Sequence, residues 1–517
     1  MAALIANTDQ SSSSSSDGRD RLSELPDHLL LVVLDKVRRD DVRLAARTCV
    51  LSKRWRGLPL MLPRLVLRAD SFLPVRARAG SVLPMRRLHQ ATAKFADALR
   101  FFLATDAGGQ RHIRRLTLHF PLIKRRRRLH EIGRLVSAAA GRGEVGALEV
   151  TLDTVEGTPS IRRDGGDAVA RGYARRFMRL FRAAPAVLVG SALRKLWLRN
   201  LCFRRAADPE GVLRACAALE TLQLTYCWFA AASPLRVDAG PRSRLRELAV
   251  EECCVERVHV VQAPELRHLT CANWFSHQHQ ACACPVTFAP GSAPSLKKMT
   301  LTNRSAPGQL SCLKLSDLLE NANPVEDLRL DFHHDRVWVQ PENRSDLAVA
   351  LSNLKRLRVS SMMPGSGISW TMFLVKAAPL LESFDIHVSP EPVCGSDDDD
   401  RGGAHRDLEW DAPPEHFERR HLRTVEIRGG IDPGRHAGFV RLVLERAVNL
   451  ELLVLDARIT CADCLKAKER DPSLVLSEFP EDKDGIDAFV RELRDGIPTS
   501  AQIILRSPCN QEFEYLN

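Results

Sequence analysis

The segment "GVLRACAALETLQL", Gly211 to Leu224, contains the pattern that decides the fold. Its first part places apolar residues at helical spacing, and its last part places Leu219, Leu222 and Leu224 at the spacing Leu-x-x-Leu-x-Leu. Because side chains alternate between the two faces of a strand, Leu222 and Leu224 share one face while Gln223 lies on the other. The segment therefore predicts a helix followed by a short strand with one apolar face.

The same strand pattern recurs along the chain, with other apolar residues sometimes replacing leucine. Two early windows are centred on Leu116 and Val150. From there on the middle residues are 196, 222, 248, 269, 299, 328, 357, 384, 425 and 453, with spacings of 26, 26, 21, 30, 29, 29, 27, 41 and 28. These spacings are typical of leucine-rich repeats, whose neighbouring units share one apolar core. The longest spacing contains the acidic, glycine-rich stretch 394–403, which predicts a solvated insertion.

Helices are expected before several of these strands. The segments that run from an apolar helical face into a strand are "GVLRACAALETLQL", "LSDLLENANPVEDLRL", "TMFLVKAAPLLESFDI" and "FVRLVLERAVNLELLVL". A closed barrel would also alternate strands with helices, but its strands are buried on both faces and are spaced more widely. We therefore expect an open α/β solenoid in which each repeat is a strand plus a return helix.

The N-terminal part has a different pattern. Between residues 20 and 60, Pro26 stands where the first turn of a helix tolerates proline, and apolar residues then recur at helical spacing. A second helix is expected after Asp40 or Asp41, and Ser52 is placed to cap a third helix that contains Trp55. A module of this size is too small to bury all its leucine and valine, so a partner should cover part of it.

This head resembles the plant form of the F-box motif. The resemblance is carried by Leu25-Pro26-Asp27, by Leu29-Leu30 and by "RTCVLSKRWR" at residues 47–56. F-box modules dock a Skp-type adaptor, which attaches them to a cullin ubiquitin ligase, and by this resemblance we expect Trp55 to serve protein contact. The residues implied to form the adaptor face or its immediate support are Leu25, Pro26, Leu29, Leu30, Val33, Leu34, Val50, Leu51 and Trp55.

The rest of the chain resembles the irregular leucine-rich repeats and FBD-type tail of plant F-box proteins. "HLRTVEIRGG", from His421, and "FVRLVLERAVNLELLVLDAR" are similar to that tail. The resemblance implies a non-catalytic subunit of an SCF-type ubiquitin ligase that holds a target protein on its repeats. The expected organisation is a disordered leader at 1–19, an F-box at 20–60, a connector at 61–110, a solenoid at 111–460 with an acidic insertion at 394–403, and an FBD-like capping region at 461–517.

Residues interleaved with the core positions of the strands should point to the concave face, where a target would bind. They carry both signs of charge, so they indicate no single class of ligand. The expected set is Trp197, Arg199, Gln223, Thr225, Glu251, Thr300, Thr302, Arg329, Asp331, Arg358, Ser360, Asp385, His387, Glu426, Arg428 and Asp456.

The overall charge permits contact with nucleic acid without arguing for it. The chain has 75 Lys plus Arg and 64 Asp plus Glu, a formal net charge of +11 over 517 residues. The run Arg125–Arg128 attracts phosphate and is of the kind that nuclear import receptors read. We find no further basic clusters interleaved with aromatic residues, so nucleic acid is not the expected partner. A nucleic-acid-binding regulator and a non-degradative scaffold remain the alternatives.

No metal, cofactor or catalytic site is expected. His277, His279, Cys282 and Cys284 have the chemistry of zinc ligands, but their spacing differs from that of common zinc modules, and the pair Cys461/Cys464 has no second pair. The sequence has no phosphate-binding glycine loop ending in Lys-Ser/Thr, no His-Glu-x-x-His and no Gly-x-Ser-x-Gly. The protein is therefore expected to be non-enzymatic.

The expected location is the nucleus, the cytoplasm or both. No apolar run approaches the roughly 20 residues that span a bilayer, and the start "MAALIANTDQ" lacks the features of a signal peptide. The 14 cysteines are scattered through leucine-rich segments, which predicts buried free thiols rather than disulfides.

Overall fold

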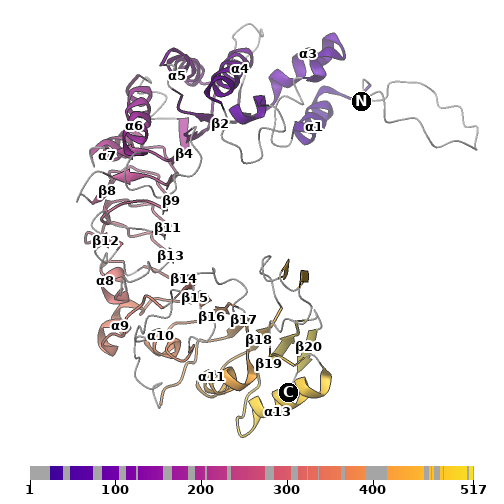
Figure 1. Ribbon diagram of the computed structural model, residues 1–517, viewed down its shortest axis with the longest axis vertical. Helices are drawn as coiled ribbons and strands as arrows, with labels where there is room; N and C mark the ends of the chain where they lie inside the picture. Colours follow the sequence, from indigo (N-terminus) through magenta and orange to yellow (C-terminus); the bar gives the residue numbers. More distant parts are fainter. Residues whose placement is uncertain are drawn as a thin grey trace, which may run out of the picture.

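The computed structural model forms a curved horseshoe with strands along its inner side and helices on its outer side (Figure 1). It describes residues 24–38, 47–73, 84–103, 112–123, 126–154, 166–183, 192–203, 207–229, 234–273, 285–303, 313–322, 324–335, 337–362, 367–389, 416–458, 465–466, 469–470, 478–480, 482–508 and 512–515. The leader, most of the second head helix, the acidic insertion and the histidine and cysteine motifs lie outside these residues.

One long sheet lines the inner side, with the strand order β1-β2-β3-β4-β6-β9-β11-β13-β14-β15-β16-β17-β18-β19-β20. All neighbours in this sheet are parallel except β20, which pairs antiparallel with β19. The strands are β1 (Arg64–Arg68), β2 (Arg115–Pro121), β3 (Leu148–Asp153), β4 (Leu193–Arg199), β6 (Thr221–Thr225), β9 (Glu247–Glu251), β11 (His268–Ala272), β13 (Lys298–Thr302), β14 (Asp327–Asp335), β15 (Arg356–Met362), β16 (Ser383–Val388), β17 (Thr424–Gly429), β18 (Leu452–Asp456), β19 (Gln502–Arg506) and β20 (Glu512–Tyr515). The expected α/β solenoid is confirmed.

The core runs along the whole sheet in register. The ten predicted middle positions, from Leu196 in β4 to Leu453 in β18, lie directly opposite one another from strand to strand. Each is at most 3% exposed. Burial of a leucine side chain stabilises a fold by about 1.5–3 kcal/mol. The neighbouring repeats provide this burial, so the stability of each repeat depends on the two that flank it. At the N-terminal end the register differs from the prediction. The predicted middle residues Leu116 and Val150 are not opposite each other, since Leu116 pairs with Leu148 and Leu118 pairs with Val150.

Helices cover much of the outer side. They are α4 (Met85–Leu103), α5 (Arg126–Gly141), α6 (Gly166–Ala183), α7 (Ala207–Ala215), α8 (Leu315–Leu319), α9 (Arg344–Ala350), α10 (Thr371–Ala377), α11 (Pro433–Arg446) and α13 (Lys483–Arg494). The four helices expected before strands are confirmed as α7, α8, α10 and α11. Helix α11 begins where Asp432 accepts a hydrogen bond from the backbone N–H of Arg435 and Pro433 occupies the first turn.

The expectation of a return helix in every repeat is wrong for the middle of the solenoid. Between β6 and β13 the described residues contain short outer strands instead of helices, and β8 (Leu235–Asp238), β10 (Val258–Gln262) and β12 (Val286–Phe288) form a second parallel sheet. A further pair, β5 (Cys202–Phe203) with β7 (Trp228–Phe229), precedes them. The spacing of 21 residues around β10 leaves little chain for a helix and two turns, but length does not decide the other repeats, because α7 lies within one spacing of 26 residues and β8 within another.

The sheet is longer at both ends than the predicted 111–460. Strand β1 and helix α4 lie in the segment expected to be a connector, and α13, β19 and β20 lie in the expected capping region. The first strand carries the same pattern as the others, because Leu62, Leu65 and Leu67 have the Leu-x-x-Leu-x-Leu spacing and are all buried. The repeat pattern therefore starts directly after the head.

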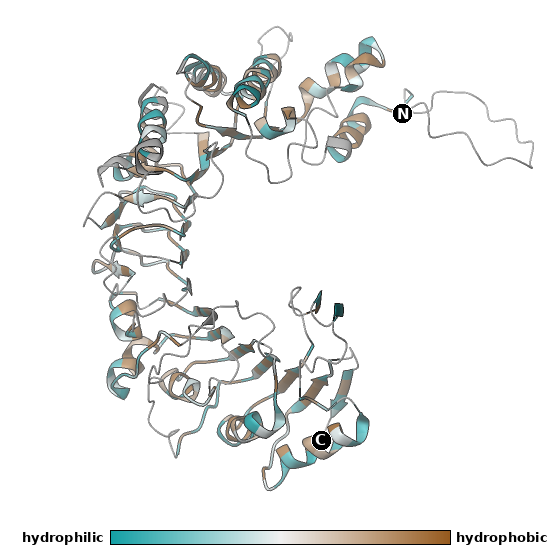
Figure 2. Ribbon diagram, in the orientation of Figure 1, coloured by the Kyte–Doolittle hydropathy of each residue, from teal (hydrophilic) through white to brown (hydrophobic). Residues whose placement is uncertain are grey.

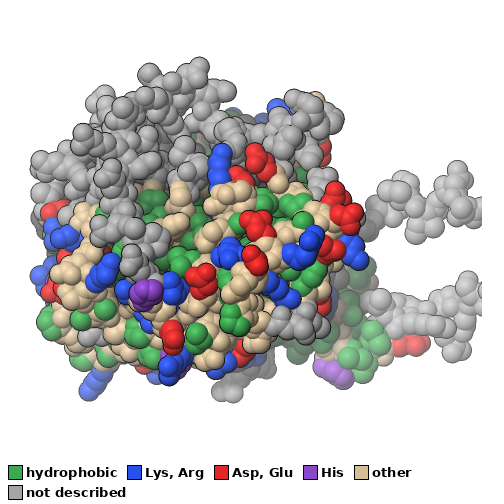
Figure 3. Space-filling view, turned by 90° about the horizontal axis from the view of Figure 1, so that it is seen from below, with side chains coloured by type: hydrophobic (Ala, Val, Ile, Leu, Met, Phe, Trp, Pro, Cys, Tyr) green, Lys and Arg blue, Asp and Glu red, His purple; other side chains and the backbone are tan. Residues whose placement is uncertain are grey.

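The cysteines of the described chain are free, as predicted. Cys49 is half-buried, and the buried ones are Cys202, Cys216, Cys227, Cys253, Cys254 and Cys271. Burial raises the pKa of the Cys216 thiol to about 12. Among the described residues, no helix is long and apolar enough to cross a membrane. Seen from the end with α11 and α13 (Figure 3), basic and acidic side chains are interspersed on the described surface.

Candidate functional site

The head consists of short helices that pack on one another and on the first strands. They are α1 (Asp27–Arg38), the 3-10 turn η1 (Thr48–Val50), α3 (Lys53–Gly57) and the 3-10 turn η2 (Leu58–Met61). Ser52 caps α3 as predicted, since its Oγ accepts a hydrogen bond from the backbone N–H of Trp55 over 3.3 Å. Arg54 joins α3 to the chain before α1, because its Nη2 donates to the carbonyl of Leu25 over 2.6 Å.

Trp55 lies inside the chain's own core. Its side chain is 4% exposed, and Leu30 and Leu34 are 0% and 1% exposed in the same core. The expectation that Trp55 serves protein contact is therefore corrected: these three residues support the surface of the head from within. The sequence could not decide this, because an apolar helix face is equally suited to the chain's own core and to a partner.

Four other apolar residues of the head face solvent. We call Leu29, Val32, Val50 and Leu51 the apolar head surface; they are 41%, 55%, 87% and 63% exposed, respectively. Much of α1 is hydrophobic in Figure 2. Pro26 is also exposed, while Leu25 and Val33 are half-buried. Several large apolar residues exposed on one small module are typical of surfaces that bind another protein.

The apolar head surface includes one residue that sequence reasoning missed. Val32 is not among the predicted residues, although it follows Leu29 by three positions and so shares its face of α1. Met61, at the end of η2, is also exposed, at 57%. Of the eleven large apolar side chains that are exposed in the described chain, five lie between Leu29 and Met61.

The residues predicted for the concave face line the inner side of the sheet in columns. In one column Trp197 lies opposite Gln223, and further along Arg358 lies opposite Asp385, which lies opposite Glu426. Two residues of the predicted set, Thr225 and Asp456, are buried and not exposed on the sheet surface. Thr225 is 7% exposed and accepts a hydrogen bond from Trp197 Nε1 over 3.0 Å, and Asp456 is 6% exposed.

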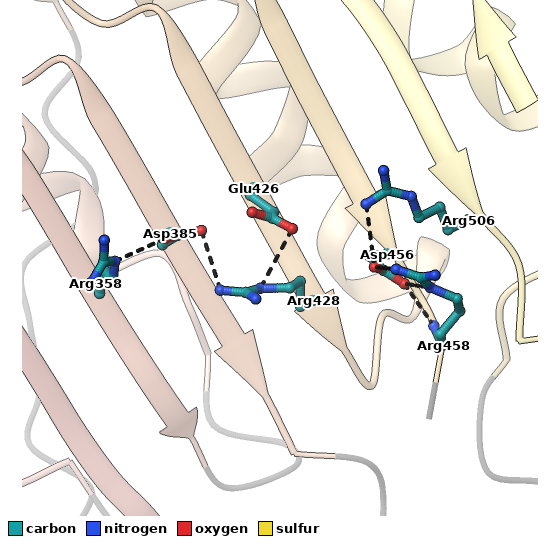
Figure 4. A network of polar contacts seen from close by, with 7 residues as sticks. All are labelled: Arg358, Asp385, Glu426, Arg428, Asp456, Arg458 and Arg506. Atoms are coloured by element: carbon teal, nitrogen blue, oxygen red, sulfur yellow. Dashed lines mark hydrogen bonds and ion pairs between the residues drawn. The ribbon is translucent and has the colours of Figure 1, made fainter. Parts of the chain in front are cut away.

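The C-terminal strands carry a network of ion pairs on this inner face (Figure 4). Arg358 donates from Nε to Asp385 Oδ2 over 3.2 Å. Arg428 lies between two carboxylates, with Nη2 3.5 Å from Asp385 Oδ1 and Nε 3.6 Å from Glu426 Oε1. Sequence reasoning placed these four residues on one face, and the structure brings them into one network across β15, β16 and β17.

Asp456 is the second centre of the network. Burial acts to raise the pKa of Asp456, but hydrogen bonds from Arg458 and the charge of Arg506 outweigh it and hold the pKa below its usual value. Arg458 Nε donates to Oδ1 over 2.8 Å, and Arg506 Nη1 lies 3.5 Å from Oδ2. The two arginines were not predicted, although Arg506 follows Leu505 in β19 as Arg428 follows Ile427 in β17.

Glu426 has less compensation than the two aspartates. Burial raises the pKa of Glu426, and the nearby carboxylates of Asp385 and Asp456 raise it further, while Arg428 acts in the opposite direction. Arg428, the cation that pairs with Glu426, is shared with Asp385. The inner face at this end is therefore a pre-ordered array of both charge signs, suited to recognise a polar surface through ion pairs.

Helix α5 begins within the predicted basic run Arg125–Arg128, at Arg126. Arg125 and the side chain of Arg126 are outside the described residues. Arg127 is exposed, and Arg128 Nη1 donates to Glu131 Oε2 over 3.0 Å on the same helix. This internal pairing reduces the positive charge that Arg128 offers to a phosphate.

A family model, the LRR domain of At1g61320/AtMIF1, matches residues 179–510, which is more than half of the chain. The chain belongs to this leucine-rich-repeat family. It is also similar to the F-box/FBD/LRR-repeat protein At3g52680 of Arabidopsis thaliana, with 33% identity over 216 residues. That match covers 40% of this chain and 41% of the relative, so the chain spans about two fifths of the length of the curated protein it matches.

The resemblance of this leucine-rich-repeat protein to plant F-box/leucine-rich-repeat proteins is thereby confirmed. Among solved structures, the crystal structure of a TLR13–ssRNA13 complex is similar over 71% of this chain and 64% of the other, with 12% identity and a TM-score of 0.16. A likeness of that strength carries no argument about fold or ligand.

Proposed function

We propose that this protein is the substrate-recognition subunit of an SCF-type cullin ubiquitin ligase. The observation that carries the proposal is the apolar head surface, Leu29, Val32, Val50 and Leu51, exposed on a head with an F-box-like sequence. Full burial of a fully exposed Val or Leu side chain gains about 1.5–3 kcal/mol, and these partly exposed side chains gain the corresponding fraction, so a partner that covers them binds favourably. A Skp-type adaptor is the partner that the sequence resemblance implies.

The shape of the chain supports a receptor that holds a target. The head lies at one end of the horseshoe, and the inner sheet faces the open side of the curve (Figure 1). A target bound on that sheet and a ligase bound through the head would be tethered to one chain. Tethering turns their encounter into a nearly intramolecular event, which raises the effective concentration of the target lysine near the ubiquitin donor.

In this proposal the chain is non-enzymatic, needs no cofactor, and works in the nucleus, the cytoplasm or both. Its partners are a Skp-type adaptor, through it a cullin, and one or more target proteins. The runner-up function is a non-degradative scaffold that docks the same adaptor without target turnover.

The test is co-purification from plant cells of the tagged full-length chain with a Skp-type adaptor and a cullin. We expect both to co-purify with the parent chain and neither with a Leu29→Asp/Val50→Asp variant, which places charges on the apolar head surface. Proteins that co-purify through the repeats should accumulate when the chain is absent. Cullin binding without any such accumulation would favour the scaffold, and no adaptor binding by the parent chain would overturn both functions.

A further inference from the structure

A row of charged residues runs along one rim of the horseshoe, where the inner strands begin. Each residue of the row donates its backbone N–H to the carbonyl of the preceding one, over 2.7–3.0 Å, so its members are neighbours from repeat to repeat. We call it the rim ladder. Its members, in order, are Arg194, Glu220, Arg246, Arg267, Lys297, Glu326, Lys355, Glu382, Arg423 and Glu451.

The charges of the rim ladder alternate in sign, except at one place. Alternation yields ion pairs between neighbours: Arg194 with Glu220 at 3.7 Å, and Arg423 with Glu451 at 2.6 Å. Glu326 is paired on both sides, since it lies 3.5 Å from Nζ of Lys297 and 3.3 Å from Nζ of Lys355. The exception is the run Arg246, Arg267 and Lys297, where three cations follow one another.

Two more arginines extend this run. Arg242 and Arg244 lie in the turn before β9, and both are exposed, as are Arg246, Arg267 and Lys297. Arg246 has a partner in Glu265 at 3.4 Å. In the described part of the chain, no carboxylate lies within ion-pair distance of Arg242, Arg244 or Arg267. We call these five residues the basic rim patch.

The surroundings of the basic rim patch only partly balance its charge. In the adjacent column of the sheet, Glu247 is exposed, while Lys298 adds another cation. Burial and the charge of Lys298 lower the pKa of His268, which lies between the strands of Glu247 and Lys298. Like charges on directly adjacent strands are destabilising. The alternation elsewhere in the rim ladder avoids that cost, whereas the basic rim patch retains it over three successive strands.

We propose that the basic rim patch binds an acidic segment of the target protein. This inference rests on the proposed receptor function and specifies the chemistry that the receptor recognises. Neighbouring strands are about 4.8 Å apart, so Arg246, Arg267 and Lys297 offer a row of cations along an edge, within reach of the side chains of one extended peptide. Carboxylates from that peptide would relieve the repulsion among the three cations.

A protein segment fits this surface better than nucleic acid does. Glu220 and Glu326 bound the run of cations in the rim ladder, and Glu247 and Glu265 lie beside it. The continuous negative charge of a phosphate backbone would be repelled by these carboxylates. A peptide can place acidic side chains beside the cations and uncharged side chains beside the carboxylates. No aromatic side chain belongs to the patch to stack on bases.

The test is binding of a fluorescent polyglutamate peptide to the full-length chain, followed by anisotropy at low and high salt. We expect salt-sensitive binding that weakens about tenfold or more in Arg267→Glu, because one attractive contact becomes a repulsive one. The same change restores alternation between Arg246 and Lys297, so the thermal stability of this variant should equal or exceed that of the parent. Arg423→Glu is the matched control from the alternating part of the rim ladder and should bind the peptide like the parent.

Three results would overturn this inference: no binding by the parent chain, equal binding by Arg267→Glu, or stronger binding of a single-stranded RNA of the same charge. Each preparation is also tested for adaptor binding. A preparation that binds the adaptor but not polyglutamate leaves the proposed function intact and removes only the acidic-segment inference. A parent chain that binds polyglutamate but not the adaptor removes the ligase function and keeps the basic rim patch as a binding site.

Discussion

The guanidinium of Arg54 donates from Nε to Oδ1 of Asp27 over 2.8 Å and so joins helix α3 to the first turn of α1. Their side chains are 40% and 53% exposed, and ion pairs at such sites contribute about 0–1 kcal/mol. The pair therefore orients the two helices more than it stabilises them. The stability of the head depends instead on the burial of Trp55 of α3 and of Leu30 and Leu34 of α1 in one apolar core.

We predict that Trp55→Ala destabilises the head by about 3–5 kcal/mol, the usual cost of removing a buried tryptophan. The measurement is hydrogen exchange of the amides of α1, which should become faster in the variant. Amides of the distant strands β14 to β18 should keep their parent exchange rates, because repeats far from the head do not contact it.

Met61→Ala is the control for this prediction. Met61 is 57% exposed, so its truncation should change stability by no more than about 0.5 kcal/mol. Parent-like exchange of α1 in Trp55→Ala would contradict the placement of Trp55 in the core of the head.

A second prediction concerns the pH dependence of the inner network. The pKa of Glu426 is raised above its ordinary 4.5, so its contribution to stability is present below that value and lost as pH rises through the raised pKa. Glu426→Gln removes the ionised form. Its melting temperature should exceed that of the parent at neutral pH, and the difference should shrink toward about pH 4.

Asp456→Asn in the same network should behave in the opposite way. The pKa of Asp456 lies below its ordinary 3.8, so its contribution is present above that value and lost as pH falls through the lowered pKa. The variant should melt below the parent at neutral pH, because Arg458 and Arg506 lose their anionic partner. Shifts of the same sign in both variants would contradict the account of the network.

A third prediction concerns the end of strand β17. Gly429 has φ +95°, and a Cβ at this position would overlap the carbonyl oxygen of Val388 on the neighbouring strand β16. Gly429→Ala should therefore cost at least about 1–3 kcal/mol from backbone strain, with a further cost from the separation of the two strands. Thermal unfolding measures the total.

Gly496→Ala provides the matched comparison for that variant. Gly496 also has a positive φ, +69°, but open space surrounds its position. Its substitution should cost only the strain of the left-handed backbone, about 1–2 kcal/mol. Equal losses in the two variants would show that the contact with Val388 has no effect.

The inner sheet was predictable from the sequence because burial of one face imposes a strict period on each strand. Leu196 and the nine later middle positions were identified correctly for that reason. The outer strands β8, β10 and β12 were not, since they are three to five residues long and their pairing depends on neighbours in space. The exposure of Val50 and the burial of Trp55 also follow from tertiary packing, which the local pattern does not encode.

The positions of the rim ladder follow a regular spacing in the sequence, although they were not predicted. Each member stands two residues before a predicted middle position, as Arg267 stands before Leu269 and Glu326 before Leu328. The apolar pattern does not mark this position, because it carries no core side chain. Ion pairs such as Asp456 with Arg506 were harder to foresee, since the residues that form them are distant in the sequence.

The most direct test of the central claim is a calorimetric titration of the purified full-length chain with a Skp-type adaptor. The account predicts binding by the parent chain and its loss in Val50→Asp/Leu51→Asp, with the hydrogen exchange of the head unchanged. Val349→Asp, at a 72% exposed valine on the outer helix α9, should bind like the parent. Absence of binding by the parent, or equal binding by the head variant, would contradict the claim that this surface docks the adaptor.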